Sequence, residues 1–451
     1  MFDVTKKYGV LGMARSGIAA AYKIKELGGS AFLSEQQWKD KIPTATQLSS
    51  DFPCEFGGHT SKLLDCDCLI VSPGIPLTIP ILVRAKAKGI ELISEIEFGY
   101  RIKDKDSKII AVTGSNGKST TASLVYHILR QMGKNAILAG NIGDAFCGYP
   151  IHKPGIDYIV LEISSFQLDL ITSFKPDVAV LLNITPDHMN RYDTFDDYAA
   201  SKARIFRFQD EEDSAILFLD SPVVTRWTAN IKSRKLLFSL QESQPKAYAC
   251  LNGKFIKFGL STMVSIYDLG IRGPHNYANA MAAMLAVHAL IPDSEAIGAA
   301  VKGFKPLTHR LEYVGSVKGV SFFNDSKATN TDSVRSALQS FERPIRIMMG
   351  GSDKGEDFSV LTEDLQQKAQ KVYITGDTQD QMRQAWLGKV PLVCIDDFEA
   401  CLRTAFEEAM AGDVIVLSPA CASFDHFHNF EHRGEVFKQI VSAIIEENEK
   451  K

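Results

Sequence analysis

The sequence predicts an α/β protein of three successive domains, each built around a mostly parallel sheet. Strands and helices alternate along the chain, and an arrangement of strand, glycine-containing turn and helix begins afresh three times. The chain has 451 residues, which is enough for roughly two to four domains with a core each. We therefore expect domains at residues 1–102, 103–305 and 306–451.

The first domain is predicted to open with a βαβ unit of the Rossmann-like type. We expect a strand at 8–12, a helix at 17–27, and strands at 31–35 and 68–71. Ala14 replaces the second glycine of a G-x-G-x-x-G loop, so a structural turn explains this spacing as well as a nucleotide site does. The loop Ser72-Pro73-Gly74 follows a strand, at the end where open α/β sheets bind ligands. Residues 101–108, rich in Lys and Asp, predict a surface linker.

The second domain begins with the most informative motif of the chain. An apolar strand at 109–113 leads through Gly114-Ser115-Asn116-Gly117 into a helix that begins Lys118-Ser119-Thr120 and runs to about residue 132. The loop amides and the helix N-terminus would hold phosphate, Lys118 would add a charge, and Ser119 could ligate Mg²⁺. An ordinary Walker loop has glycine where Val112 stands. A chance glycine turn is the alternative, and the apolar strand with Lys-Ser-Thr disfavours it.

More strands of the second domain are predicted to end in polar residues. We expect strands at 135–139, 158–163 and 178–184, and helices at 196–207 and 275–290. The polar residues at or just after the ends of these three strands are Asn141, Glu162 to Leu168, and Asn183 to His188. Because the carboxyl ends of parallel strands meet at one edge, these side chains should converge on a shared site.

The third domain is predicted to be another Rossmann-like α/β unit after Pro306. We expect strands at 320–324, 346–349, 371–375, 392–395 and 414–417. The expected helices are at 332–340, 398–410 and 433–446.

Composition limits the classes of function. With a net charge of −4, the chain has no general surface for nucleic acid or membrane. No apolar run reaches the ~18–20 residues that span a bilayer, and glycines with Arg15 near the N-terminus argue against a secretory signal. The eight cysteines show no regular spacing, and Cys66-Asp67-Cys68 is expected to be incidental. We therefore expect reduced thiols in a cytoplasmic protein.

The variant phosphate loop resembles that of the Mur ligases and folylpolyglutamate synthases, which join an acid and an amine at the expense of ATP. Further motifs that look like this family occur in its order over nearly the whole chain. They are Glu162-x-Ser164-Ser165-Phe166-Gln167-Leu168, Asn183-Ile184-Thr185-Pro186-Asp187-His188-x-x-Arg191-Tyr192, His275-Asn276-Tyr277-x-Asn279, Asn324-Asp325-Ser326-Lys327-Ala328-Thr329-Asn330 and Leu417-Ser418-Pro419-Ala420-Cys421-Ala422-Ser423. The runs after Glu162 and after Ser423 favour the D-glutamate-adding branch.

The resemblance implies three domains, for the uridine nucleotide, for ATP and for the amino acid, with a P-loop-type central domain. It implies that the substrates are UDP-N-acetylmuramoyl-L-alanine, D-glutamate and ATP, joined through an acyl phosphate in cytoplasmic peptidoglycan precursor synthesis. Two Mg²⁺ ions, a monomer, and neither nucleic-acid partner nor membrane insertion are expected.

The resemblance also implies roles for individual residues. The catalytic set is Lys118, Glu162, His188 and Lys202. The metal ligands are Ser119, Glu162, His188 and Lys202, the last as a CO₂-derived carbamate. ATP contacts are expected at Gly114, Ser115, Asn116, Gly117, Lys118, Ser119, Thr120, Asn276, Asn279, Arg310, Asp325 and Lys327. Contacts to the uridine substrate are expected at Arg15, Ser16, Ser72, Pro73, Gly74, Asn141 and Ser164. The D-glutamate contacts are Thr329, Lys354, Ser423, Phe424 and Phe430.

The residues by themselves leave plainer interpretations open. A lone histidine such as His188 is usually a structural hydrogen-bonding group, and Lys202 would usually be a solvated helix lysine. Glu162 could cap a helix, and residues 325–327 could form a polar turn. His426 and His428 lie close enough in sequence to suggest a metal site, but surface or packing roles are preferred. The strand ending at Ser34 and Glu35 departs from the family pattern, so uridine contacts are expected elsewhere.

Rival functions predict different features. A folylpolyglutamate synthase should lack the βαβ unit before residue 100. A plain P-loop NTPase or kinase would not need three α/β units, and a dehydrogenase would rest on the weak loop around Gly12 alone. A binding protein without catalysis would be expected to have lost Lys118, Glu162 or His188.

Overall fold

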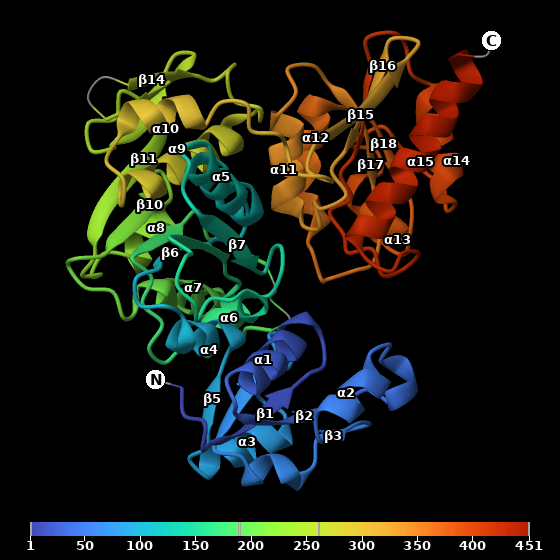
Figure 1. Ribbon diagram of the computed structural model, residues 1–451. Helices are drawn as coiled ribbons and strands as arrows, with labels where there is room; N and C mark the ends of the chain where they lie inside the picture. The colour runs from blue at the N-terminus through green and yellow to red at the C-terminus, as the bar shows by residue number, and fades with distance from the viewer. Residues whose placement is uncertain (1, 188, 190, 260–261, 450–451) are drawn as a thin grey trace. The chain divides into compact units, whose positions relative to one another are not determined.

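The computed structural model describes residues 2–187, 189, 191–259 and 262–449, and it confirms the α/β fold class (Figure 1). The chain forms two compact units. The N-terminal unit comprises Met1–Ile184, Arg191–Ser265 and Ala278–Lys302, and the C-terminal unit comprises Thr185–Asn190, Ile266–Tyr277 and Gly303–Lys451. The boundaries expected at residues 102/103 and 305/306 stay a prediction.

The first sheet is parallel and turns its strand order at β1. Its elements are β1 (Lys7–Leu11), α1 (Arg15–Glu26), β2 (Ser30–Ser34), α2 (Ala45–Asp51), β3 (Cys54–Glu55), β4 (Cys68–Val71), α3 (Pro80–Ala87), β5 (Glu91–Ile93) and α4 (Glu95–Ile102). The order is β3-β2-β1-β4-β5. The backbone N–H of Ser72 donates to the carbonyl of Leu11 at 3.0 Å, so the loops after β4 and β1 lie side by side. A crevice at such a reversal is the usual ligand site of an open α/β sheet.

The second sheet has β6 between β8 and β9. Its elements are β6 (Lys108–Thr113), α5 (Lys118–Gln131), β7 (Ala136–Gly140), β8 (Tyr158–Glu162), α6 (Ser165–Leu168), β9 (Val178–Leu181), α7 (Phe195–Ala203), β10 (Ser214–Phe218), α8 (Pro222–Trp227), β11 (Arg234–Glu242), β12 (Ala249–Asn252), β13 (Phe255–Phe258), β14 (Thr262–Ser265), α9 (Pro274–His288) and α10 (Ser294–Ala300). Val112 of β6 is in register with Glu162 of β8, and Thr113 with Leu181 of β9. The three carboxyl ends are therefore level with one another.

The strands from β10 to β14 lie in a region where the sequence analysis predicted none. They extend the sheet in the order β14-β13-β12-β11-β10-β9, and the β14–β13 and β13–β12 pairings are antiparallel. Along β13 the residues alternate between exposed and buried, with Phe255 and Lys257 exposed and Ile256 and Phe258 buried. A short, half-solvated strand such as β13 has no continuous apolar run, which explains why it was missed. This reason does not apply to β10, where Ala215-Ile216-Leu217 is apolar and buried.

The third sheet is covered by helices on both faces, as Figure 1 shows for α11 and α12 on one side and α14 and α15 on the other. Its elements are β15 (Glu312–Val317), β16 (Val320–Asn324), α11 (Thr331–Gln339), β17 (Ile345–Met349), α12 (Thr362–Lys368), β18 (Ala369–Ile374), α13 (Gln379–Trp386), β19 (Leu392–Cys394), α14 (Phe398–Glu407), β20 (Val414–Leu417) and α15 (Phe430–Glu449). Ile347 and Met349 pack toward α11, whereas Met348 between them packs toward α14 and α15. The period of two expected of a strand buried on both faces is therefore present.

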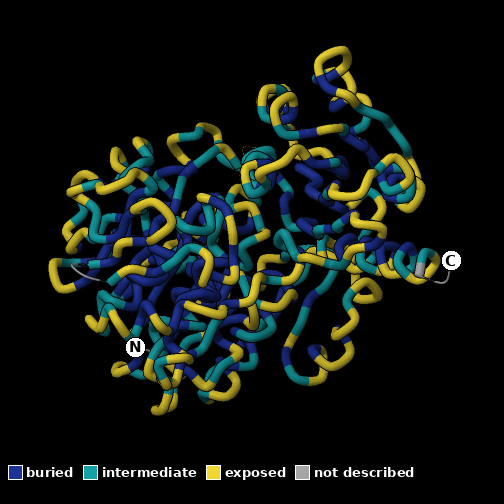
Figure 2. The backbone as a smooth tube through the Cα atoms, turned by 90° about the horizontal axis from the view of Figure 1, so that it is seen from above, coloured by how far each residue is buried: buried dark blue, intermediate teal, exposed yellow. Residues whose placement is uncertain are grey.

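Each strand and helix that the sequence predicted is present, with ends that shift by a few residues. In Figure 2 the buried stretches lie toward the interior of the backbone trace and most exposed ones at its periphery. In the part of the chain that the structure describes, no helix is both long enough and apolar enough to cross a membrane.

The surface linker predicted at 101–108 is only partly correct. Arg101 belongs to α4, where its guanidinium donates to Glu97 at 2.8 Å and to Glu91 at 2.5 Å, and its side chain is 23% exposed. The sequence shows a run of charges at 101–108, but the carboxylates that pair with Arg101, Glu91 and Glu97, lie before that run. The connection to β6 is therefore limited to residues 103–107.

Glu97 ties the first sheet to the second within the N-terminal unit. This carboxylate is fully buried and accepts backbone N–H bonds from Thr172 at 3.0 Å, Ser173 at 3.0 Å and Phe174 at 2.8 Å. Burial raises the pKa of Glu97, but hydrogen bonds from Ser173, Thr172 and Arg101 outweigh it and leave the pKa below its ordinary value. The carboxylate must therefore stay charged for the junction to hold.

We expect Glu97→Ala to lower the free energy of unfolding by roughly 3–5 kcal/mol, because Arg101 and three amides would lose a buried partner. Since the folded pKa is depressed, this stabilisation is present above about pH 4.3, the unfolded value, and is lost as the pH falls through the folded value. Chemical denaturation at pH 7 and at lower pH measures both effects.

Glu399→Ala, which removes an exposed Glu–Arg pair with the same helical spacing, should cost no more than about 0.5 kcal/mol. Equal losses of unfolding free energy in the two variants would contradict the role assigned to the buried Glu97 carboxylate.

Candidate active site

The loop of residues 114–117, which joins β6 to α5, is fixed by Asn183 from the neighbouring strand end. The backbone N–H of Ser115 donates to the carbonyl of Asn183 at 3.0 Å, and that of Asn116 donates to its side-chain oxygen at 2.8 Å. The side-chain amide of Asn183 donates back to the carbonyl of Asn116 at 3.1 Å. Asn183 was not among the predicted site residues. Its place at the end of a strand was the available signal, but only the sheet order makes it a neighbour of the loop.

Gly117 closes the loop at a position that admits no side chain. Its φ is +84°, in the left-handed region, and a Cβ atom there would lie 2.3 Å from the side-chain oxygen of Asn279 on α9. Gly117 is the residue that precedes α5, so the helix starts against α9. The predicted ATP residue Asn279 is thereby brought to the phosphate loop, although 162 positions separate the two in sequence.

Two lysines converge on one carbonyl oxygen of the loop. Nζ of Lys118 donates to the carbonyls of Gly114 at 3.0 Å and Ser115 at 2.7 Å, and Nζ of Lys202 donates to the same Gly114 carbonyl at 2.7 Å. Lys202 is 2% exposed and its ammonium lies 4.6 Å from the centroid of the Tyr198 ring. The plainer interpretation of Lys202, a solvated helix lysine, is therefore wrong, because α7 packs its lysine-bearing face against the loop. The metal-binding role that the resemblance implies for Lys202 stays a prediction.

Glu162 ends β8 beside the loop. Its carboxylate is 2% exposed and accepts from the side-chain amide of Asn141, at the end of β7, at 2.8 Å. Ser119 and Thr120 lie buried in the first turn of α5. A carboxylate and a hydroxyl are hard oxygen donors of the kind that Mg²⁺ takes. This donor set fits a Mg²⁺ ion that takes further ligands from a nucleotide phosphate and water.

The residues predicted for the uridine substrate lie at two loops of the first sheet and at two strand ends of the second. Arg15 begins α1 and donates to the carbonyl of Gly143 at 2.5 Å. Ser72 donates to the carbonyl of Gly12 at 3.4 Å, and the carbonyl of Gly74 accepts from Arg191 at 3.3 Å. The remaining members are Ser16 on α1, Pro73 in the loop after β4, Asn141 after β7 and Ser164, the N-cap of α6. All of them belong to the N-terminal unit.

Ser34 and Glu35 serve the first sheet itself. The Ser34 hydroxyl donates to Glu55 at 2.6 Å and contacts Nδ1 of His59 at 2.7 Å. Glu35 accepts from the backbone N–H of Met13 at 2.6 Å. Glu35 therefore helps to build the turn after β1, and Ser34 joins β2 to β3 and the loop that follows it.

In the C-terminal unit, Asp325 lies where the ends of β16 and β20 meet. Its carboxylate accepts from the hydroxyl of Ser418 at 2.9 Å and from the backbone N–H of Leu311 at 3.3 Å. Burial raises the pKa of Asp325 to about 7, against the opposing effects of the Ser418 hydrogen bond and of Arg310. The carboxyl group is thus near the midpoint of its titration at neutral pH. Lys327, two residues on, lies 4.9 Å from the centroid of the Phe430 ring.

Arg433 holds this end of the third sheet together, a role that the sequence analysis did not foresee. Its guanidinium is 1% exposed and donates to the hydroxyl and carbonyl of Ser326 and to the carbonyls of Cys421 and Ala422, all at 2.9–3.0 Å. Burial lowers the pKa of Arg433 to about 10, so it remains charged at neutral pH. The loops after β16 and β20, which carry predicted ATP and D-glutamate residues, are thereby fixed to each other.

The residues predicted for D-glutamate belong to the C-terminal unit. Lys354 donates to the hydroxyl of Thr329 at 3.4 Å. Ser423 is buried, Phe430 begins α15, and Phe424 is 73% exposed. The exposed rings of His426 and His428 follow, and no group of three or more His, Cys, Asp or Glu side chains able to hold a metal occurs among the residues described.

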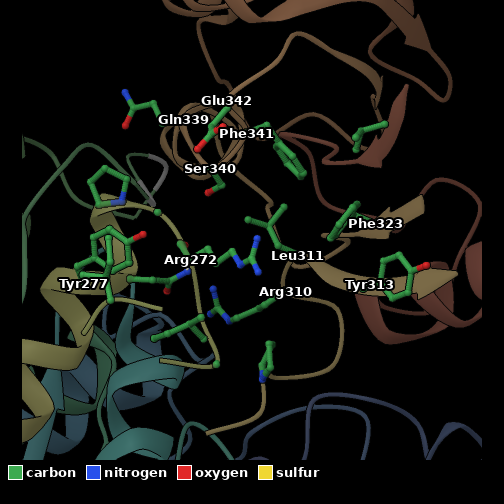
Figure 3. A pocket seen from close by; sticks show the side chains of 18 of the residues that line it. Arg272, Tyr277, Arg310, Leu311, Tyr313, Phe323, Gln339, Ser340, Phe341 and Glu342 are labelled. Atoms are coloured by element: carbon green, nitrogen blue, oxygen red, sulfur yellow. Dashed lines mark hydrogen bonds between the residues drawn. The ribbon is translucent and has the colours of Figure 1, made fainter. Parts of the chain in front are cut away.

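A cavity of about 980 Å³ in the C-terminal unit includes two of the predicted ATP residues, Asn276 and Arg310 (Figure 3). The guanidinium groups of Arg272 and Arg310 extend into it, and Tyr313 and Phe323 line its right-hand side in that view. The volume suits a nucleotide-sized molecule, and its cations and rings suit an anion with an aromatic base. His188 lies outside the described residues, so its predicted metal role stays a prediction.

Three family models match the chain in succession. The Mur ligase MurD-like N-terminal domain matches residues 6–94, the Mur ligase middle domain matches residues 112–287, and the Mur ligase glutamate ligase domain matches residues 309–421. The chain is 38% identical to a UDP-N-acetylmuramoylalanine–D-glutamate ligase of Koribacter versatilis, over 99% of each chain. It is 39% identical to the protein of the same name from Elusimicrobium minutum, over 97% of this chain and 98% of that one.

Solved structures with the same fold include a UDP-N-acetylmuramate-alanine ligase from Thermotoga maritima. It has a TM-score of 0.64 and 17% identity, and covers 97% of this chain and 99% of its own. A ligase of related type from Acinetobacter baumannii has a TM-score of 0.63 and 16% identity, over 98% of this chain and 90% of its own. At these identities the similarity supports the fold.

We expect Gly117→Ala to weaken ATP binding at least about tenfold, because the left-handed backbone and the contact with Asn279 both oppose a Cβ atom. Isothermal titration calorimetry with ATP measures this. Gly133→Ala is the matched control, because Gly133 has a φ of +73° at the other end of α5 and nothing within 4 Å of its Cβ position. It should lose about 1 kcal/mol of stability and keep its ATP affinity. Weakened binding in both variants would assign the effect to general strain in α5.

Proposed function

This chain belongs to the Mur ligase family, and from that premise we propose that it adds D-glutamate to UDP-N-acetylmuramoyl-L-alanine with hydrolysis of ATP to ADP and phosphate. The observation that carries the proposal is the 38% identity over 99% of both chains to a ligase named for this reaction. The match of a MurD-like N-terminal domain to residues 6–94 also argues against the folylpolyglutamate synthase alternative, which was expected to lack that unit.

The reaction needs an activated acid, because a free carboxylate has no leaving group that an amine can displace. The carboxylate of the alanyl substrate attacks the terminal phosphorus of ATP, and ADP leaves. The amine of D-glutamate then attacks the acyl carbon, loses a proton, and expels phosphate as the amide bond forms. The first step mainly requires positioning and neutralisation of charge, and the second requires that water be excluded.

The phosphate loop supplies the positioning and much of the charge. The N-terminus of α5 is suited to hold phosphate, and Lys118, the first residue of that helix, brings a cation to it. Lys118 donates to loop carbonyls in the structure, and we propose that it turns from them to the transferring phosphoryl group. Mg²⁺ bound through Glu162 and Ser119 would neutralise phosphate charge.

The C-terminal unit is proposed to bind the amino acid and part of the nucleotide. Lys354 is suited to the side-chain carboxylate of D-glutamate, with Thr329 beside it. Asp325 is suited to the ribose hydroxyls, since near the midpoint of its titration it can accept or donate. Arg310 and Lys327 are suited to phosphate charge, and the cavity around Arg310 supports this assignment.

Lys202 is proposed to act as a carbamate, formed when its neutral amine adds to CO₂ with loss of a proton. The modified side chain would bring oxygen atoms to the phosphate loop in place of an ammonium group, which suits a second Mg²⁺ that His188 would also bind. The buried position of Nζ at the Gly114 carbonyl supports a role in this site rather than at the surface. We also propose that the enzyme is a cytoplasmic monomer. Light scattering is the direct test of its oligomeric state.

The purified protein should form ADP, phosphate and an amide only when ATP, Mg²⁺, UDP-N-acetylmuramoyl-L-alanine and D-glutamate are all present. Coupled measurement of ADP release, with mass spectrometry of the product, tests this. L-lysine or meso-diaminopimelate in place of D-glutamate should give no product. Comparable turnover with either would refute the assignment.

Lys202→Ala should reduce kcat by roughly 10²–10³, the scale seen when a preorganised charged group is removed, and acetate should restore part of it. Lys202→Arg should stay inactive, because a guanidinium cannot form the carbamate. Lys23→Ala is the control, since Lys23 is a buried helix lysine paired with Glu26 at 2.6 Å and has no predicted catalytic role. If Lys202→Arg keeps the parent activity, the carbamate hypothesis fails, and Lys202 only stabilises the loop through its hydrogen bond to the Gly114 carbonyl.

A further inference from the structure

The segment Thr185–Asn190 follows β9 of the second sheet, yet it belongs to the C-terminal unit. The hydroxyl of Thr185 donates to Oδ2 of Asp332 on α11 at 2.9 Å, across 147 positions of sequence. A local explanation exists for Asp332, because an acid in the first turn of a helix is stabilised by the helix dipole. That explanation does not account for a bond to a residue so distant in sequence.

Arg335 fixes the direction in which Asp332 points. Its guanidinium donates to the other oxygen of Asp332, Oδ1, at 3.2 Å, to Asp364 at 2.9 Å and to the carbonyl of Val360 at 3.0 Å. An arginine held by three acceptors cannot easily follow a rotation of one of them. The carboxylate of Asp332 is therefore oriented with Oδ2 toward Thr185.

Glu356 is bonded to the beginning of α11 and lies near the same segment. Its carboxylate accepts from the backbone N–H of Thr331 at 3.1 Å and from the Thr331 hydroxyl at 2.9 Å. Burial raises the pKa of Glu356, and the charge of Asp187 raises it further, so Asp187 lies near this carboxylate. Thr329, a predicted D-glutamate residue, stands two positions before Thr331. The start of α11 thus adjoins both the 185–187 segment and the predicted amino-acid site.

We propose that Asp332 is a positioning residue that fastens the 185–187 segment to α11, so that this segment moves with the amino-acid-binding unit and not with the sheet from which it emerges. Thr185 precedes the predicted metal ligand His188 by three residues. The hydrogen bond would then couple the location of D-glutamate to that of the segment leading to His188. This kinetic consequence rests on the proposed function, whereas the attachment of the segment does not.

Hydrogen–deuterium exchange and steady-state kinetics on the full chain test the proposal with Thr185→Val, Asp332→Ala, the double variant and Asp332→Asn. The backbone amides at 182–187 should exchange several-fold faster in each of the first two variants, because local opening is easier without the bond. The double variant should exchange no faster than either single variant, since both remove the same interaction. Asp332→Asn keeps an acceptor oxygen and should restore most of the protection.

The kinetic readout separates positioning from general damage. Thr185→Val and Asp332→Ala should each lower kcat for amide formation roughly tenfold, as expected for a lost hydrogen bond to a charged group, with the KM for ATP within twofold of the parent. The control Asp380→Ala removes another exposed acid from the first turn of a helix in the same unit and should change neither exchange nor kcat. Unchanged exchange at 182–187, or effects that add in the double variant, would overturn the proposal. If the parent makes no amide with D-glutamate, the proposed function fails, and the exchange result alone decides the attachment.

Discussion

The absence of a side chain at Gly117 is the constraint on which the candidate site depends. At this position the chain must take a left-handed turn, start a helix and come within contact of Asn279 on α9. A Cβ atom would be strained by the left-handed backbone and would have to displace the side chain of Asn279, so the start of α5 and a predicted nucleotide residue meet at one glycine. The N-terminus of α5, which begins there, is suited to binding of a phosphate chain.

The rest of the N-terminal unit holds this loop by hydrogen bonds from several strand ends. Asn183 pairs with the loop on one side of β6, and Glu162 with Asn141 stands on the other. Lys118 and Lys202 share the Gly114 carbonyl. Two cations are therefore gathered at the loop where the predicted phosphate would lie.

In the C-terminal unit, a buried arginine holds the loops at the strand ends in place. Arg433 donates to Ser326 in the loop after β16 and to the carbonyls of Cys421 and Ala422 in the loop after β20, and so fixes these two loops to each other. Residues predicted to bind ATP occur in both units, with the phosphate loop in one and Arg310, Asp325 and Lys327 in the other. Within the C-terminal unit, the 185–187 segment is held by the bond from Thr185 to α11.

The sequence by itself determined the fold class, the three α/β starts and the phosphate loop, because these are local patterns. Apolar strands, glycine turns and a Lys-Ser-Thr helix start are written in consecutive residues, and the family motifs retain their order. Only the tertiary structure decided which strand ends become neighbours, so Asn183 was given no role of its own and Arg433 was missed, and the burial of Lys202 could not be read from its helix. The strands from β10 to β14 were also missed, although β10 has the buried apolar run Ala215-Ile216-Leu217. Hydrogen bonds such as Glu97 to residues 172–174 and Thr185 to Asp332 join positions far apart in the chain, and no local pattern contains them.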